Sequence, residues 1–106
     1  MSDTMIKVAE VDDIPVGEVK IFEVEDIPVA ICNVDGTFYA IENVCSHDDA
    51  PLGEGKLRGT EIECPRHGAR FDVTTGEIKR QPAYAPIKTF PVRIENGAIY
   101  IDISKY

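Results

Sequence analysis

Two short segments of the chain bring together side chains that bind metals. One segment reads VCSHDD and places Cys45 two positions before His47. The other reads ECPRHGARFD and places Cys64 three positions before His67. The chain has three cysteines and two histidines, so four of these five residues fall in the two segments. Thiolates and imidazoles are ligands of zinc and of iron–sulfur centres, and the pattern therefore predicts a metal centre.

Two kinds of centre fit this ligand set. The spacing is Cys-x-His, then sixteen residues, then Cys-x2-His. Zinc takes two thiolates and two imidazoles readily, but structural zinc sites usually pair cysteines in one loop and histidines in another. A binuclear iron–sulfur centre in which two histidines replace two cysteines on one iron is compatible with one ligand of each type from each loop. The spacing favours the iron–sulfur cluster and leaves zinc as the alternative.

With these ligands the chain resembles the Rieske [2Fe-2S] proteins. The four residues match the C-x-H-x16-C-x2-H motif of that family. Further matches to the motif C-P-x-H-G-x-x-[FY]-D, and to a proline in a third loop that covers the cluster, are Pro65, Gly68, Phe71, Asp72 and Pro82. The whole chain is similar to the soluble Rieske-type ferredoxins, which serve multicomponent oxygenases that act on aromatic rings.

The resemblance implies a one-electron carrier and not an enzyme. Its cofactor would be a [2Fe-2S] cluster, with Cys45 and Cys64 on one iron and His47 and His67 on the other. Its expected partners are an NAD(P)H-dependent ferredoxin reductase, which supplies electrons, and a terminal oxygenase, which receives them. Because the protein supplies all four ligands, no iron position is left for a substrate, and no catalytic residue is expected.

The resemblance also bears on the reduction potential. Two ferric ions, two sulfides, two thiolates and two neutral imidazoles sum to zero charge, so such centres span about −150 to +300 mV against roughly −400 mV for plant-type ferredoxins. High-potential relatives carry a disulfide where this chain has Ala50 and Arg66. They also carry serine and tyrosine hydroxyl donors where it has Ala69 and Phe71. We therefore expect a potential at the low end of the range.

Charged residues near the ligands would shift this potential further. Asp48 and Asp49 directly follow a histidine ligand and disfavour the reduced form. Arg66 or Arg70 would offset them. Asp72 is interpreted as a turn cap or as a partner of Arg70.

The elements that position these segments are predicted to be strands. Residues 27–43 and 89–103 each contain two β-prone runs, which join at Asp35-Gly36 and at Asn96-Gly97 and predict hairpins. Residues 17–26 predict a further strand, and the run EIEC predicts a short strand that ends at Cys64. No apolar stripe has a helical period. The predicted fold is all-β, a Rieske-like antiparallel β-sandwich in one domain (1–106), with an inserted loop-rich cluster-binding subdomain at approximately 43–86.

Composition sets the remaining limits. A chain of 106 residues has room for one domain. Its net charge of −8 argues against nucleic-acid binding and is compatible with positively charged partner surfaces. No membrane span or leader is evident, and we expect a cytoplasmic monomer.

Two further functions remain open at this point. The chain could be the Rieske-like small subunit of a larger reductase such as nitrite reductase. It could also be a zinc-stapled interaction module without a redox role. The sequence does not name the oxygenase, the reductase or the substrate that the system would serve.

Overall fold

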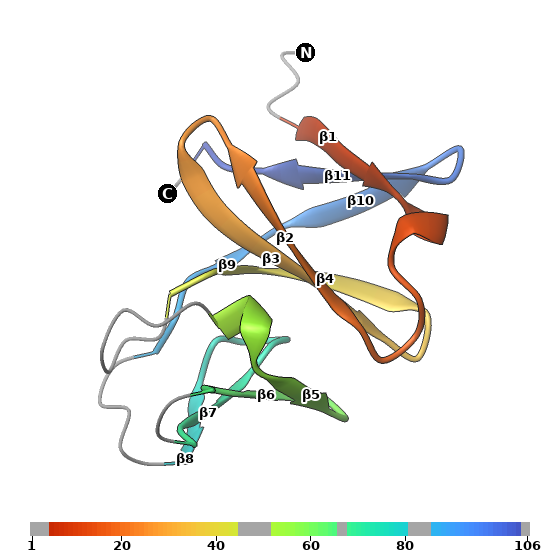
Figure 1. The fold of residues 1–106 in the computed structure, drawn as a ribbon. Helices are drawn as coiled ribbons and strands as arrows, with labels where there is room; N and C mark the ends of the chain where they lie inside the picture. The colour runs from red at the N-terminus through yellow and green to blue at the C-terminus, as the bar shows by residue number, and fades with distance from the viewer. Residues whose placement is uncertain (1–4, 45–51, 66–67, 81–85, 105–106) are drawn as a thin grey trace.

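The computed structural model describes residues 5–44, 52–65, 68–80 and 86–104. Within them the chain forms three antiparallel sheets and no α-helix, with two short 3-10 helices, η1 (Val11–Asp13) and η2 (Leu52–Glu54). The predicted all-β fold is therefore confirmed (Figure 1). No helix in these four ranges is long and apolar enough to cross a membrane.

Two of the sheets form a sandwich. The first has the order β1-β11-β10, and the second has the order β2-β3-β4-β9. The bounds of their strands are β1 (Met5–Glu10), β2 (Val19–Val24), β3 (Ile27–Val34), β4 (Thr37–Glu42), β9 (Thr89–Phe90), β10 (Val92–Glu95) and β11 (Ala98–Asp102). The sandwich core between them contains Val29 and Ile31 from β3 together with Ile99 and Ile101 from β11, all fully buried.

The third sheet is a small lobe that the chain forms between β4 and β9. It has the order β5-β6-β7-β8, with β5 (Lys56–Arg58), β6 (Glu61–Glu63), β7 (Arg70–Asp72) and β8 (Ile78–Arg80). In Figure 1 this sheet lies below the sandwich, next to η2. We refer to β5–β8 together with η2 as the lobe.

Strand β3 is buried on both of its faces. Successive side chains of a strand point to opposite sides, so Val29 and Ile31 enter the sandwich core, while Ala30 and Cys32 enter a second apolar cluster that β3 shares with the lobe. The members of this second cluster from the lobe include Leu52, Ile62, Cys64, Ala69 and Phe71. The continuous apolar run of β3 is explained by this double burial, which fixes the lobe to the sandwich.

The turns agree with the sequence in two places and differ in a third. Asp35-Gly36 and Asn96-Gly97 have positive φ at both positions, as expected for tight hairpin turns. The β2–β3 hairpin turns at Glu25 (φ 51°) and Asp26 (φ 70°), a pair without glycine that gave no turn signal. Strand β1 was not predicted either, because its pairing with β11 shifts register between Lys7 and Ala9 and breaks the alternation.

Candidate metal centre

Of the four predicted ligands, the structure describes Cys64. The other three, Cys45, His47 and His67, lie outside the described residues. So do Asp48, Asp49, Ala50, Arg66 and Pro82. Among the residues described, no three Cys, His, Asp or Glu side chains gather as a metal site. The described part of the centre consists of Cys64 and of the residues that flank the three segments 45–51, 66–67 and 81–85.

Cys64 lies at the end of β6 and is 1% exposed. Its backbone N–H donates to the Ala69 carbonyl (2.6 Å), and its own carbonyl accepts from the Gly68 N–H (3.2 Å). These bonds close the turn that joins β6 to β7. Gly68 has φ +76°, a conformation that glycine adopts without strain, which explains the residue type at this point of the motif. The second ligand segment therefore has both of its ends fixed.

The first segment returns to the scaffold directly beside Cys64. Its described end is Leu52, which is fully buried in the same apolar cluster as Cys64. A side chain on Gly55 would overlap the carbonyl oxygen of Glu63, so the backbone after η2 lies against the residue before Cys64. This close approach requires glycine at position 55. The chain thus leaves the first segment and enters the second at neighbouring points.

A buried asparagine joins the two ends of the first segment. Asn43, which follows β4, is 8% exposed. Its Oδ1 accepts from the Gly53 N–H (2.6 Å), and its backbone N–H donates to the Pro28 carbonyl (3.0 Å). Buried polar side chains are costly unless they are bonded in this way. The role of Asn43 was not predicted from the sequence. The one sequence feature that could have indicated it is an amide side chain directly after a strand rich in apolar residues.

The third segment is anchored to the β7–β8 hairpin. The Ile87 N–H donates to the Gly76 carbonyl (3.0 Å), and the Glu42 N–H donates to the Lys88 carbonyl (2.9 Å). Ile87 is 5% exposed and belongs to the cluster that contains Cys64. The described ends of all three segments therefore join one packed unit made of η2, the lobe sheet and the end of β4.

Four charged residues lie on the lobe beside the turn at Cys64. Glu63 Oε1 is 3.3 Å from Arg58 Nε and 3.9 Å from Arg70 Nη2, and Arg70 Nη1 is 3.8 Å from Glu61 Oε1. Arg70 Nε is buried and has no hydrogen-bond partner among the described residues. Among the described residues the carboxylate partners of Arg70 are Glu61 and Glu63, and not Asp72 as one interpretation had it. Sequence analysis did not single out either glutamate.

Asp72 caps the turn between β7 and β8. Its Oδ1 accepts from the Thr74 hydroxyl (2.6 Å) and the Thr74 N–H (2.8 Å), and its carbonyl accepts from the Gly76 N–H (2.7 Å). The Thr74 hydroxyl bond holds the pKa of the Asp72 carboxyl below its usual value. The turn-cap interpretation is therefore confirmed, and this explains the aspartate of the motif.

Cys32 is a buried thiol of the scaffold. It is fully buried in β3, and this burial raises the pKa of its thiol to about 12. We expect iodoacetamide at pH 8 to leave Cys32 unmodified in the folded protein, because the reactive thiolate is absent and the sulfur is inaccessible. Mass spectrometry of the Cys32 peptide measures this, with a urea-denatured sample as the control. Equal labelling of the folded and denatured samples would contradict the burial.

The residues around Cys64 fit a metal cluster. Its thiol forms no disulfide among the described residues, lies in an apolar surround, and belongs to a turn held at both ends. Comparison with known proteins identifies the centre: the family model of the Rieske [2Fe-2S] domain matches residues 4–91. The chain belongs to the Rieske [2Fe-2S] domain family. The predicted cofactor, held by two cysteines and two histidines, is thereby confirmed, and the zinc alternative is set aside.

Similar proteins extend over nearly the whole Rieske domain. The ferredoxin component of the naphthalene 1,2-dioxygenase/salicylate 5-hydroxylase systems of a Ralstonia species is 45% identical over 101 residues, covering 95% of this chain and 97% of that protein. The ferredoxin of carbazole 1,9a-dioxygenase from Nocardioides aromaticivorans IC177 has a TM-score of 0.91 at 33% identity and covers 94% and 98%.

A third similar structure is a complex. The complex of reduced oxygenase and oxidised ferredoxin in carbazole 1,9a-dioxygenase contains a chain with a TM-score of 0.88 at 35% identity, and the match covers 95% of the present chain and 94% of that chain. The predicted likeness to the ferredoxin components of aromatic dioxygenase systems is confirmed by these comparisons. So is the prediction of an electron-transfer component in place of an enzyme.

Proposed function

We propose that this Rieske domain carries single electrons from an NAD(P)H-dependent reductase to the terminal oxygenase of an aromatic-ring dioxygenase system. The proposal rests on the similarity to ferredoxin components of such systems and to a ferredoxin in complex with its oxygenase. These matches cover nearly the full length of this chain and of the proteins compared. The cluster, when bound, supplies the one-electron chemistry. The chain's own residues hold it, shield it and set its potential.

The proposed ligands are Cys45 and Cys64 on one iron and His47 and His67 on the other. Cys64 supports this assignment, because its thiol is buried at a turn that backbone hydrogen bonds hold at both ends. Cys32 is equally buried in the same apolar cluster, so the feature that distinguishes Cys64 is its place in the ligand motif and in this turn. The cluster-binding subdomain is proposed to comprise the lobe and the segments that it anchors, approximately residues 43–86.

A low potential within the Rieske range is the second part of the proposal. The side chains of Ala69 and Phe71 are fully buried and have no hydroxyl group to donate to a cluster sulfur. A missing donor leaves the additional negative charge of the reduced cluster less stabilised, which favours the oxidised form. A carrier with such a potential accepts electrons from a flavin reductase more naturally than from a quinol.

Phe71→Tyr and Ala69→Ser should each raise the reduction potential. A hydroxyl donor that favours the reduced form by about 1.4 kcal/mol corresponds to a rise of about 60 mV for a one-electron couple. Redox titration followed by visible absorption measures the shift. Val73→Thr adds a hydroxyl to the same buried cluster, two residues further along the chain than Phe71, and should leave the potential unchanged. Equal shifts in all three variants would contradict the assigned positions.

A reconstitution experiment tests the proposed function itself. The purified holoprotein is mixed with NADH and the reductase of a naphthalene dioxygenase system, and bleaching of its visible spectrum is followed under argon. Under argon we expect reduction that requires both NADH and the reductase. Once the oxygenase and dioxygen are then added, we expect reoxidation of the carrier and turnover of naphthalene. Reduction without electron delivery to any dioxygenase, together with co-purification of a large flavin or haem subunit, would contradict the proposal and support a reductase subunit.

A further inference from the structure

Glu63 places a carboxylate against the turn that carries two of the proposed ligands. It directly precedes Cys64, and its Oε2 lies 3.4 Å from where a side chain on Gly68 would begin. Gly68 follows His67 in sequence. The Glu63 side chain is 26% exposed, so solvent and salt screen its charge less than that of a fully exposed carboxylate. A negative charge held at this point disfavours addition of an electron to the cluster.

Two arginines hold this carboxylate from either side. Arg58 reaches it from β5 and Arg70 from β7, with nitrogen-to-oxygen distances of 3.3 and 3.9 Å. The Arg70 side chain is 28% exposed, and its Nε is buried. Glu63 and Arg70 are register partners, the last such pair of the β6–β7 hairpin before the ligand turn. The two guanidinium groups therefore compensate the charge at the entrance to the turn.

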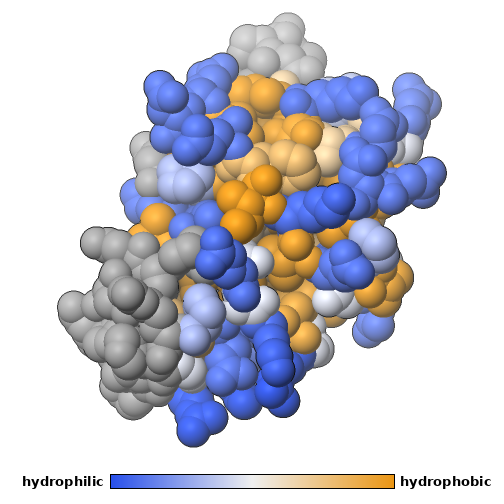
Figure 2. Space-filling view, in the orientation of Figure 1, coloured by the Kyte–Doolittle hydropathy of each residue, from blue (hydrophilic) through white to orange (hydrophobic). Residues whose placement is uncertain are grey.

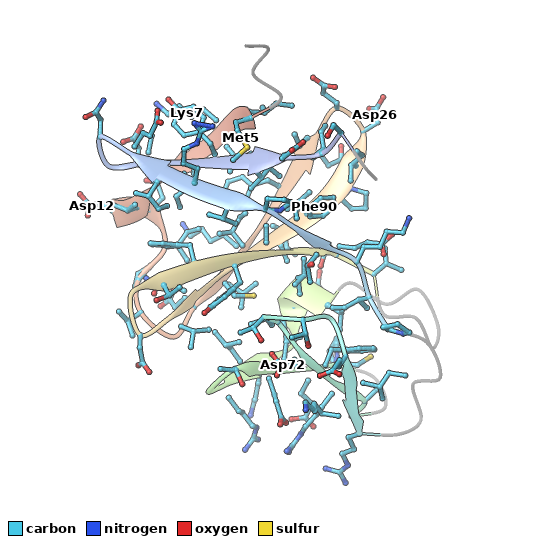
Figure 3. All side chains as sticks on the ribbon, turned by 180° about the vertical axis from the view of Figure 1, so that it is seen from behind. Met5, Lys7, Asp12, Asp26, Asp72 and Phe90 are labelled. Atoms are coloured by element: carbon cyan, nitrogen blue, oxygen red, sulfur yellow. The ribbon has the colours of Figure 1, made fainter. Side chains whose placement is uncertain are left out.

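Cations outnumber carboxylates in the row of register partners that contains Glu63, while Glu61 shares Arg70 from outside this row, at a nitrogen-to-oxygen distance of 3.8 Å. Lys56 is the register partner of Glu63 on β5, and Arg80 is the register partner of Arg70 on β8. The row across the four strands thus contains three cations and one carboxylate. Charged side chains of β5–β8 gather on the outer side of the lobe, near the labelled Asp72 (Figure 3). Hydrophilic residues predominate on the coloured part of the lobe surface (Figure 2).

We propose that Arg58 and Arg70 act as positioning residues that neutralise Glu63 and so hold the reduction potential of the cluster above the value that an uncompensated carboxylate would impose. The inference rests on the proposed function, because it assumes a cluster at the turn between Cys64 and Gly68. It adds a second influence on the potential, separate from the absence of hydroxyl donors at positions 69 and 71. The carboxylate and the guanidinium groups act through the electric field at the turn, and they ligate no iron.

A double-mutant cycle on the holoprotein tests the proposal. Arg70→Gln should lower the reduction potential, so that the ratio of reduced to oxidised protein at the wild-type midpoint falls about tenfold. Glu63→Gln should raise the potential. The double variant should lie close to wild type, because the two opposite charges are removed together and their shifts cancel. All potentials are measured at pH 7.5, and repetition in 1 M NaCl should reduce each shift.

Matched controls come from a similar pair on the sandwich. Arg93 Nη1 lies 3.4 Å from Glu95 Oε2 on β10, and both side chains are about half exposed. Arg93→Gln and Glu95→Gln change the net charge by the same amounts and should leave the potential unchanged. Arg58→Gln removes a guanidinium that is 57% exposed, so it should fold even if Arg70→Gln does not, and it should lower the potential.

The outcomes separate this proposal from the proposed function. An intact one-electron couple whose potential is the same in Glu63→Gln, Arg58→Gln and the β10 controls would overturn the inference and leave the carrier function standing. A double variant whose potential equals that of either single variant would also overturn it, since one of the two charges would then have no effect on the cluster. Absence of any one-electron couple in the wild type would instead overturn the proposed function.

Discussion

Replacing Cys64 with serine should give a colourless protein that retains its β-sandwich. Cys64 is the proposed iron ligand at the end of β6. Serine has no sulfur, and its hydroxyl does not ionise readily, so it does not supply the thiolate that iron–sulfur clusters require. Iron and sulfide content should fall to near zero, and the visible absorption should disappear. The far-ultraviolet circular dichroism of the sandwich should persist. The apolar core of the sandwich is separate from the group of buried apolar side chains that includes Cys64.

Cys32→Ala provides the control for this substitution. Cys32 is buried in the same apolar cluster as Cys64, so both variants remove a buried thiol from similar surroundings. We expect Cys32→Ala to keep full iron content and colour while losing about 1–2 kcal/mol of stability through lost packing. A Cys64→Ser protein with wild-type iron content would show that Cys64 is not a ligand.

The second large effect is expected at Gly76, where Gly76→Ala should destabilise the lobe strongly. A side chain on Gly76 would overlap the carbonyl oxygen of Ile87, the residue whose N–H donates to the Gly76 carbonyl. The substitution therefore separates the β7–β8 hairpin from the segment that follows residue 85. Overlap in a packed site typically costs about 1–3 kcal/mol, in addition to about 1–2 kcal/mol for a side chain at positive φ.

Comparison with Gly17→Ala separates the steric cost at Gly76 from the cost of a side chain at positive φ. Gly17 and Gly76 both have φ +84°, but a side chain on Gly17 would meet nothing within 4 Å. The difference in melting temperature between the two variants therefore reports the contacts at Gly76, of which the overlap with Ile87 is the tightest. About 2 kcal/mol corresponds to roughly 8–16 °C for a domain of this size, measured by circular dichroism and by loss of cluster absorption on heating. Equal melting temperatures would show that the β7–β8 turn moves away from Ile87 without cost.

The sequence predicted much of this scaffold because several local signals are strong. Asp35-Gly36 and Asn96-Gly97 are residue pairs that tolerate positive φ, and each lies between β-prone runs. The short strand before Cys64 was also predicted correctly, since a turn at Gly59 precedes it. Strand β1 was missed because its register shift removes the period of two that identifies a half-buried strand.

The electrostatics of the candidate site could not be predicted in the same way. Arg58, Glu63 and Arg70 come from three different strands, and their contacts depend on the register of two hairpins. A one-residue change of register would turn each side chain to the other face of the sheet. Sequence alone shows that the charges exist, whereas the fold shows which of them meet. The ligand motif was accessible from sequence because its spacing is itself the signal.

The closed ends of the three segments have a consequence for how iron enters the protein. Hydrogen bonds from Asn43, Cys64 and Gly76 join scaffold residues, and none of them depends on a metal. The entropy of loop closure is therefore lost when the sandwich and lobe fold, and not when the cluster is inserted. Zinc fingers, in contrast, order their chain at the expense of metal-binding free energy. In this chain less of the metal-binding free energy is used to order the backbone, because the cluster is inserted into a pre-organised scaffold. More of that free energy therefore contributes to the affinity for the cluster.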